Sequence, residues 1–235
     1  MRKLYCEGET MKSDNQSNAV VPYAKVALRN KSGEVSAIRR AEDGAADYVP
    51  HISPADIRQI VTVAGQQKRH GERNSLLTKL LFDGALRCSE AIGTRPCDLT
   101  RDGNGWAISI MGKRAKPGKV AISPSLAAEM QSYCYRSKVL ETERIFPISR
   151  SQCFRVVCNA FDCAGVRRPT RDTDRVGAVH ILRHSWAIAR LQATGNPKAL
   201  QDQLRHKSAQ MTLRYLKTVS ADESLKIQQG VDFHW

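Results

Sequence analysis

His180-Ile181-Leu182-Arg183-His184 places a histidine and an arginine three positions apart, and on a helix such a pair shares one face. Downstream comes Leu204-Arg205-His206, followed nine positions after its histidine by Tyr215. Upstream, Leu86-Arg87-Cys88-Ser89-Glu90 adds an arginine at the end of an apolar helical pattern. An H-x-x-R pair alone occurs by chance in many basic proteins. The ordered set of arginine, histidine-arginine pair, histidine and tyrosine is far more specific.

Length and charge narrow the class of protein. A chain of 235 residues is long enough for one sizeable domain plus a short appendage, and 41% hydrophobic residues can fill its core. The net charge of +14 favours a polyanionic partner, most often nucleic acid, although a solvated basic surface is the alternative. No run of 18 apolar residues predicts a membrane span, and the basic start of the chain lacks the apolar segment of a secretory signal.

The seven cysteines do not form a metal-binding pattern, because the chain has no C-x-x-C. Cys153, Cys158 and Cys163 recur every five positions, which turns each about 140° from the last on a helix. We therefore expect no metal site, and we interpret the cysteines as small buried hydrophobic residues in a reducing cytoplasm.

The chain divides into three parts. Residues 1–48 contain no long amphipathic helix and have turn chemistry at 30–34, so we expect a short basic arm that is partly flexible. Residues 49–219 carry the periodic patterns of a folded domain. The tail 220–235 has apolar anchors that could dock on a neighbouring subunit or pack on its own domain.

Helix signals dominate the domain. Ser53 as N-cap, Pro54 in the first turn and Asp56 two positions later predict a helix start. A second helix is predicted from about residue 74 to 86, and a short one from near Ser89. From Ser125 onward the pattern is helical, with breaks at Pro147, at Pro169 and at residues 196–197, and a basic loop spans residues 165–178.

Between residues 98 and 123 the period changes from 3.6 to 2. Trp106, Ile108 and Ile110 alternate with smaller or polar residues, and Val120 and Ile122 do the same. Turn chemistry at 102–105 and 116–118 separates these runs. The pattern predicts a small antiparallel sheet of three strands, the first of them near residue 99.

Over residues 50 to 220 the ordered set resembles the tyrosine recombinases of the phage-integrase family. The resemblance implies a mixed α/β (α+β) fold, mainly helical with a small three-stranded antiparallel sheet. The chain departs from the family in its N-terminal segment, about half as long as the usual helical DNA-clamping domain. It also has Arg205 where a glycine is usual and Ile181 where an acidic residue is common.

The resemblance assigns a role to each site residue. Tyr215 would be the nucleophile that forms a covalent phosphotyrosine. Arg87 and Arg183 would bind the charge of the pentavalent transition state, since guanidinium forks stay protonated at neutral pH. His206 would donate to the same oxygens, and His180 would assist proton transfer at the tyrosine.

A lysine on the hairpin between the second and third strands would protonate the leaving group. Lys113 matches this position best, because it follows the glycine that ends the second strand, and Lys116 is the alternative. The basic residues expected to contact DNA are Arg114, Lys116, Lys119, Arg167 and Arg168.

Each residue also has a structural interpretation. Arg87 could cap a helix, the pair His180 and Arg183 could lie on the surface, and Tyr215 could be a half-buried helix residue. Glu90 is expected to make a salt bridge or a cap rather than a catalytic contact. The remaining histidines, His51, His70, His184 and His234, receive no role from the sequence.

The predicted function is site-specific DNA recombination of the integrase or resolvase type, through a 3′-phosphotyrosyl bond on Tyr215. The bond energy is kept in that linkage, so no cofactor, ATP or metal is implied. The expected partners are double-stranded DNA with inverted half-sites, three further copies in a homotetramer, and an accessory DNA-binding protein in place of the missing clamp. The expected location is the cytoplasm, at the nucleoid. A type IB topoisomerase and a catalytically weak accessory or regulatory protein of the same fold remain as alternatives.

Overall fold

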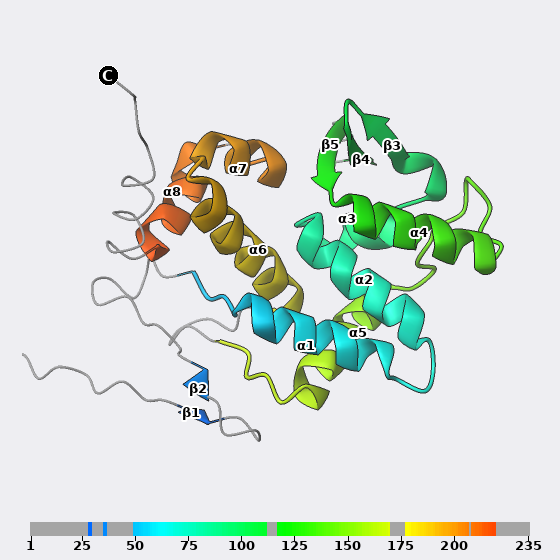
Figure 1. The fold of residues 1–235 in the computed structure, drawn as a ribbon, viewed down its shortest axis with the longest axis horizontal. Helices are drawn as coiled ribbons and strands as arrows, with labels where there is room; N and C mark the ends of the chain where they lie inside the picture. Colours follow the sequence, from blue (N-terminus) through cyan, green and yellow to red (C-terminus); the bar gives the residue numbers. More distant parts are fainter. Residues whose placement is uncertain are drawn as a thin grey trace, which may run out of the picture.

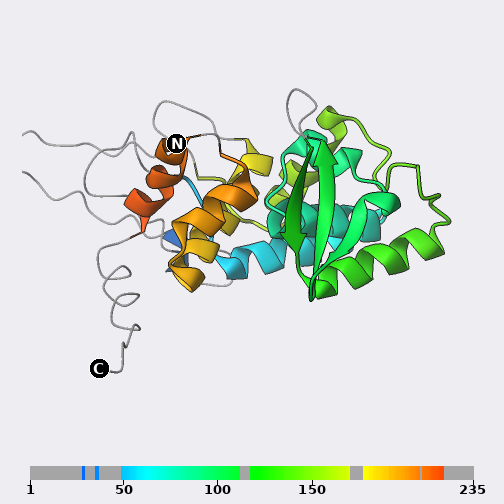
Figure 2. The same cartoon turned by 90° about the horizontal axis from the view of Figure 1, so that it is seen from above.

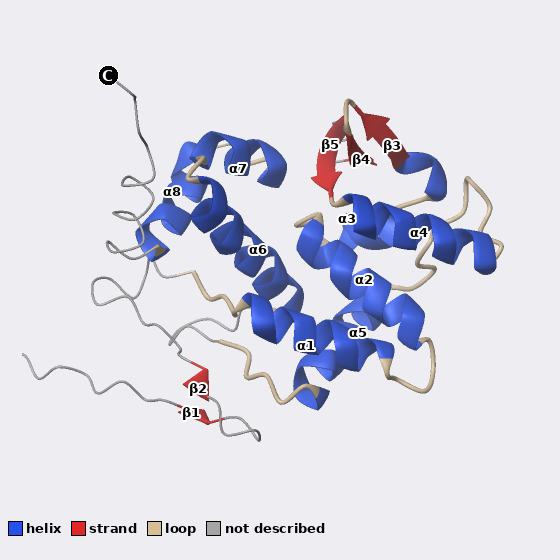
Figure 3. Cartoon of the chain, viewed as in Figure 1, coloured by secondary structure: helices blue, strands red, loops and turns tan. Residues whose placement is uncertain are grey.

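The computed structural model describes residues 28–29, 35–36, 49–111, 117–169, 177–206 and 208–219. Helices make up most of this part of the chain (Figures 1 and 3). They are α1 (Pro54–Gly65), α2 (Gly71–Asp83), α3 (Cys88–Gly93), α4 (Pro124–Arg136), α5 (Arg150–Cys163), α6 (Ala178–Thr194), α7 (Pro197–Leu204) and α8 (Ala209–Thr218), with the 3-10 turn η1 (Pro96–Asp98). None of the described helices is both long and apolar enough to cross a membrane.

The predicted three-stranded sheet is confirmed. Strands β3 (Leu99–Asp102), β4 (Gly105–Met111) and β5 (Pro117–Ile122) pair antiparallel in the order β3-β4-β5, and the β4–β5 register sets Ile108 opposite Val120. Both residues are buried, because alternate side chains of the strands face the helices. Figure 2 shows the strands side by side in front of the helices, with α4 running beside them. The fold is therefore the expected mixed α/β class.

A separate strand pair lies in the N-terminal region. β1 (Leu28–Arg29) and β2 (Val35–Ser36) pair antiparallel on either side of the turn predicted at 30–34. The remainder of the predicted arm 1–48 lies outside the described residues, as does the tail 220–235. The division of the chain into these parts stays a prediction.

Helix α1 begins where the sequence predicts. The Ser53 hydroxyl accepts from the Asp56 backbone N–H at 3.1 Å, and the Asp56 carboxylate accepts from the Ser53 backbone N–H at 3.2 Å. This reciprocal pair satisfies two N–H groups that the first helical turn leaves without partners.

The predicted bounds of the second helix are wrong by three residues at each end. Helix α2 begins at Gly71, where an added Cβ would lie only 2.2 Å from the carbonyl oxygen of Gly65. It ends at Asp83, and the chain then turns through Gly84 and through Ala85 at φ 47°. Ala85 and Leu86 are fully buried outside the helix, so their apolar character extended the periodic pattern beyond its end.

The core consists of two clusters that meet along α6. The larger cluster contains residues from the five helices α1 through α5, from the inner face of the sheet and from the first turns of α6. The smaller one joins the second half of α6 to α7, α8 and Ala85. Figure 1 shows α7 and α8 grouped on one side of α6, with the sheet, α3 and α4 on the other. Residues on α6, α3 and α7 can therefore converge between the two clusters.

The cysteines follow the prediction only in part. Cys134 and Cys153 are buried, whereas Cys97 and Cys163 are exposed. Helix α5 buries Cys153, Val157 and Phe161 on one face. The rotation of five-residue spacing carries Cys163 away from that face, so it cannot share the environment of Cys153.

Candidate active site

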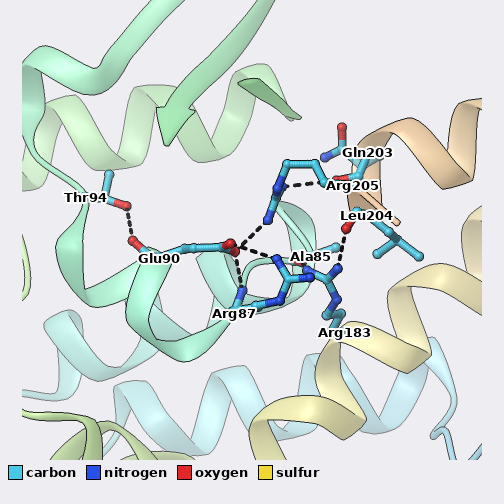
Figure 4. Close-up of polar contacts among 8 residues, drawn as sticks. All are labelled: Ala85, Arg87, Glu90, Thr94, Arg183, Gln203, Leu204 and Arg205. Carbon is cyan, nitrogen blue, oxygen red and sulfur yellow. Dashed lines mark hydrogen bonds and ion pairs between the residues drawn. The ribbon is translucent and has the colours of Figure 1, made fainter. Parts of the chain in front are cut away.

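Arg87 and Glu90 form the start of α3. The Glu90 carboxylate accepts from the Arg87 backbone N–H at 2.8 Å and from Arg87 Nη1 at 2.9 Å. It also accepts from Arg205 Nη2, which approaches from the end of α7, at 2.6 Å (Figure 4). The predicted structural role of Glu90 as cap and salt-bridge partner is confirmed, and the Arg87 side chain remains 43% exposed.

The charge of Glu90 is maintained despite its burial. Burial alone would raise its pKa, but the Arg87 backbone N–H and the charges of Arg205 and Arg87 outweigh that effect and lower the pKa of Glu90. Glu90 therefore stays ionised and holds two guanidinium groups.

Arg183 joins α6 to two other elements. It is only 5% exposed, and its Nη1 donates to the Ala85 carbonyl while Nη2 donates to the Leu204 carbonyl at 2.6 Å. Both carbonyls lie at chain turns that leave them free of helical partners. Burial, then the charge of Arg87, lowers the pKa of Arg183 to about 10, so the guanidinium remains protonated at neutral pH.

Tyr215 lies inside the smaller cluster, on the inner face of α8. It is 4% exposed, and its hydroxyl is 2.9 Å from Nδ1 of His184. Burial raises the pKa of Tyr215, and the charges of Arg183, Arg214 and Arg87 offset part of the rise. Arginine charges therefore act on the phenol although the hydroxyl is withdrawn from solvent.

His206 stacks on the tyrosine. The two rings are 5.9 Å apart between centroids with an interplanar angle of 11°, and His206 Nδ1 is 3.1 Å from Thr212 Oγ1. Burial, followed by the charges of Arg183, Arg87 and Arg205, lowers the pKa of His206 to about 4. The imidazole is therefore neutral at physiological pH and keeps one N–H to donate.

His180 occupies the first turn of α6 and remains exposed. Its pKa is lowered, first by partial desolvation of the ring and then by the charges of Arg183, Arg87 and Arg150. Its ring lies 6.3 Å from that of His184, one turn further along the same helix. A neutral imidazole here can accept a proton.

Five of the predicted residues therefore gather where α3, α6, α7 and α8 meet: Arg87, His180, Arg183, His206 and Tyr215. Lys113, Arg114 and Lys116 lie outside the described residues, in the connection between β4 and β5. Lys119 makes an exposed ion pair with Asp102 at 3.0 Å. On the loop after α5, Arg167 is exposed and Arg168 approaches Asp162 at 3.4 Å.

Sequence reasoning missed two residues of this cluster, His184 and Arg205. His184 follows His180 by four positions, so helical spacing places both on one side of α6. Arg205 carried no signal of its own, because its partner Glu90 lies 115 positions away in the chain.

Among the described residues, the cluster combines three arginines with the carboxylate of Glu90, beside a phenol and neutral imidazoles. Planar guanidinium groups suit a tetrahedral or trigonal phosphoryl group, which accepts their hydrogen bonds in pairs. The site therefore sets guanidinium groups beside a phenol, an arrangement that suits the binding of a phosphoryl group next to a tyrosine.

Residues 50–221 match the model of the phage integrase family, and the chain belongs to that family. Tyrosine recombinase XerD of Mycobacterium leprae is 27% identical over 179 residues, which cover 68% of this chain and 54% of that protein. Tyrosine recombinase XerC of Nitrobacter winogradskyi is 29% identical over 197 residues, covering 79% of this chain and 59% of that protein. The chain thus spans little more than half the length of these relatives.

Solved structures confirm the fold. The XerH site-specific recombinase bound to its difH substrate in a pre-cleavage complex superposes with a TM-score of 0.61 at 20% identity, covering 85% of this chain and 58% of that one. The catalytic domain of bacteriophage HP1 integrase gives a TM-score of 0.56 at 19% identity, covering 77% of this chain and 95% of that domain.

Proposed function

We propose that this chain is a site-specific DNA recombinase that cleaves and rejoins strands through Tyr215. The observation that carries the proposal is the convergence of Arg87, Arg183, His206 and Tyr215 from four different helical elements onto one site. Family membership adds support, because the relatives that the chain matches include tyrosine recombinases.

In the proposed reaction the phenolic oxygen of Tyr215 attacks phosphorus. A new bond joins the tyrosine oxygen to the phosphorus, which stays attached to the 3′ end of the cut strand. The bond from phosphorus to the 5′-oxygen breaks, and that oxygen takes up a proton and leaves as a hydroxyl. A 5′-hydroxyl from another strand then attacks the phosphotyrosine and releases the phenol. The phosphodiester energy is conserved, so the proposal requires neither ATP nor a metal ion.

Arg87 and Arg183 would bind the non-bridging oxygens of the transition state. Arg183 is fixed by two carbonyls, and Arg87 is fixed by Glu90, so neither has to reorganise as charge develops. The Thr212 hydroxyl, donating to Nδ1 of His206, would leave the Nε2–H of His206 as a further donor. Lys113, or alternatively Lys116, would act as the general acid that protonates the leaving 5′-oxygen.

The free chain holds the nucleophile in a protected position. With its hydroxyl on His184 and 4% exposure, Tyr215 can reach a phosphate only after α8 shifts relative to α6. Before this shift the Tyr215 hydroxyl contacts His184 Nδ1, and His180, one turn away on α6, would assist transfer of the phenolic proton once the hydroxyl reaches the phosphate. We propose that DNA binding supplies this shift.

The partner in this proposal is double-stranded DNA with inverted half-sites, bound by Arg114, Lys116, Lys119, Arg167 and Arg168. The active assembly would be a homotetramer on two sites, with an accessory DNA-binding protein, in the cytoplasm at the nucleoid. The relatives named as recombinases favour this reading over a catalytically weak accessory protein or a topoisomerase.

Covalent trapping on a nicked suicide substrate tests the proposal. The wild-type chain should accumulate a covalent DNA adduct, and Tyr215→Phe should abolish it while DNA binding stays within about threefold, because only the hydroxyl is removed. Tyr135→Phe is the matched control, since Tyr135 is 87% exposed on α4 and should react normally. Mapping the adduct to any tyrosine other than Tyr215 would refute the assignment, and relaxation of supercoils without strand exchange would favour a topoisomerase.

A further inference from the structure

Arg205 adopts a backbone conformation that favours glycine. Its φ is 53°, in the left-handed region where a side chain is strained and glycine is not. It is nevertheless an arginine, and it directly precedes His206 in the candidate active site. Its side chain is only 17% exposed. The contacts of this side chain are therefore the feature that needs a physical reason.

Those contacts centre on Glu90. Arg205 Nη2 lies 2.6 Å from Glu90 Oε2, while Arg87 Nη1 lies 2.9 Å from Glu90 Oε1 (Figure 4). The Glu90 side chain is 5% exposed, so two cations share one buried anion. Without Arg205, the carboxylate would neutralise Arg87 alone and draw its guanidinium inward. With Arg205 present, the group of three retains a net positive charge for an incoming phosphate.

Arg205 also connects α3 to the sheet. Its Nη1 donates to the Gln203 carbonyl at 3.2 Å, and its Cδ lies 3.2 Å from where a Cβ on Gly118 would be. Gly118 belongs to β5, whose first residue directly follows the hairpin that carries Lys113 and Lys116. One side chain thus spans three elements that border the site.

We propose that Arg205 is a positioning residue, which holds the Glu90 carboxylate and offsets its charge so that the Arg87 guanidinium remains available to the scissile phosphate. The inference rests on the proposed function, since it gives Arg87 a phosphate to bind. Arg205 acts through Glu90 and Arg87, and it need not touch the DNA.

The backbone conformation offers a clean substitution. Arg205→Gly removes the side chain and suits the left-handed geometry, so the fold should persist, as thermal unfolding would verify. Single-turnover cleavage of the suicide substrate should slow by about tenfold to a hundredfold, with DNA affinity within about threefold. Arg205→Lys should recover most of the rate because it restores a cation, whereas Arg205→Gln should not. Arg136→Gln is the matched control, because Arg136 also pairs with a glutamate, Glu72, on the surface between α4 and α2.

A substrate with a neutral scissile group separates positioning from a merely structural role. A methylphosphonate at the scissile position replaces one charged oxygen by methyl, so its transition state depends less on the charge of Arg87. The loss caused by Arg205→Gly should shrink to less than about threefold on this substrate. In a Glu90→Gln background, Arg205→Gly should likewise have a smaller effect, since the carboxylate that couples the two arginines is gone.

Three results would overturn the inference. One is an unchanged rate for Arg205→Gly on the ordinary substrate, and another is an equal loss on both substrates, which indicates structural damage. The third is strict additivity with Glu90→Gln. If the wild-type chain forms no adduct with either substrate, the proposed function itself has failed and the inference falls with it. That result is distinct from an active wild type with an insensitive Arg205 variant.

Discussion

At the scale of single residues, this site is built from charges that are buried but satisfied. Arg183 is almost inaccessible, yet it donates to the Ala85 and Leu204 carbonyls and stays charged. A buried guanidinium without such partners would be strongly destabilising. Burial, and after it the charges of Arg183 and Arg87, lowers the pKa of His180 and of His206, so both imidazoles are neutral at physiological pH.

His206 makes stability depend on pH. Its pKa is about 4 in the folded chain, against about 6.5 when unfolded, so between these values only the unfolded state binds the proton. The free energy of unfolding is therefore highest above pH 6.5 and decreases as the pH falls toward 4. After discounting for partial exposure we expect a decrease of about 1–2 kcal/mol from this residue.

Urea unfolding between pH 4 and 8 measures this effect. His206→Gln removes the titrating group, so the free energy of unfolding of this variant should vary less with pH over that interval. Above pH 7 the free energies of unfolding of wild type and variant should depend on pH in the same way. His180 contributes in the same direction in both proteins, because its pKa is also lowered. Identical pH dependences for wild type and variant would contradict the prediction.

At the scale of elements, short segments between helices and strands bring the site together. The turn after α2 presents the Ala85 carbonyl to Arg183, and the segment after α7 presents Arg205 to Glu90 and His206 to Tyr215. Each of these segments depends on an adjoining element for its position. Substitutions in these connecting segments should therefore affect the proposed DNA cleavage as well as the stability of the fold.

The hairpin prediction concerns the leaving group. Lys113→Ala should slow cleavage of an ordinary phosphodiester by about 10²-fold or more, because the 5′-oxygen then leaves without a proton donor. A substrate with sulfur at the 5′-bridging position should be cleaved almost normally, since a thiolate leaves unaided. If the sulfur substrate restores cleavage by Lys116→Ala but not by Lys113→Ala, the general acid is Lys116 rather than Lys113.

The joint between α7 and β5 offers a stability test. The Gln203 side chain accepts from the Ala121 backbone N–H at 3.0 Å and donates to the Ala121 carbonyl at 2.8 Å, and so covers the free edge of the sheet. Gln203→Ala should lower the free energy of unfolding by about 1–2 kcal/mol and speed hydrogen exchange at the Ala121 amide. Gln210→Ala, on the exposed side of α8, should change stability by less than about 0.5 kcal/mol. Equal effects of the two variants would contradict the role given to Gln203.

At the scale of the whole molecule, two core clusters share α6, and the site lies between them. In this arrangement α7 and α8, with Tyr215, pack on the second half of α6 in a cluster separate from the larger one. It is compatible with a nucleophile that is protected in the free chain and delivered on DNA. The net charge of +14 provides the general attraction for DNA that would accompany such a change.

The N-terminal arm should contribute to DNA affinity through phosphate contacts. It carries the basic residues Lys25, Arg29, Lys31, Arg39 and Arg40. Each phosphate neutralised steepens the dependence of log affinity on log salt by about 0.9. Removing residues 1–45 should lower that slope by the few contacts the arm makes, and leave cleavage of a pre-nicked site intact.

Binding titrations at several salt concentrations measure the slope for the two proteins. We expect one copy to bind a single site weakly with a modest slope, and two copies to bind inverted half-sites cooperatively. Tight, salt-insensitive and non-cooperative binding by the full chain would show that the segment is an ordered clamp rather than an arm.

The sequence by itself determined the three-stranded sheet, the start of α1 and the residue types of the site, and the family resemblance implied the fold class. These features depend on local signals: period, capping and the spacing of side chains within a few turns. The family resemblance then assigned a role to each of the site residues. The sequence did not determine how these residues are arranged in space.

The tertiary structure alone decided that Glu90 joins Arg87 to Arg205, and that His184 rather than solvent meets the Tyr215 hydroxyl. The physical reason is distance along the chain. Arg205 meets Glu90 across 115 positions, and Arg183 meets Ala85 across 98. Such contacts form because two core clusters pack against each other, and local periodicity carries no information about which turns that packing brings together.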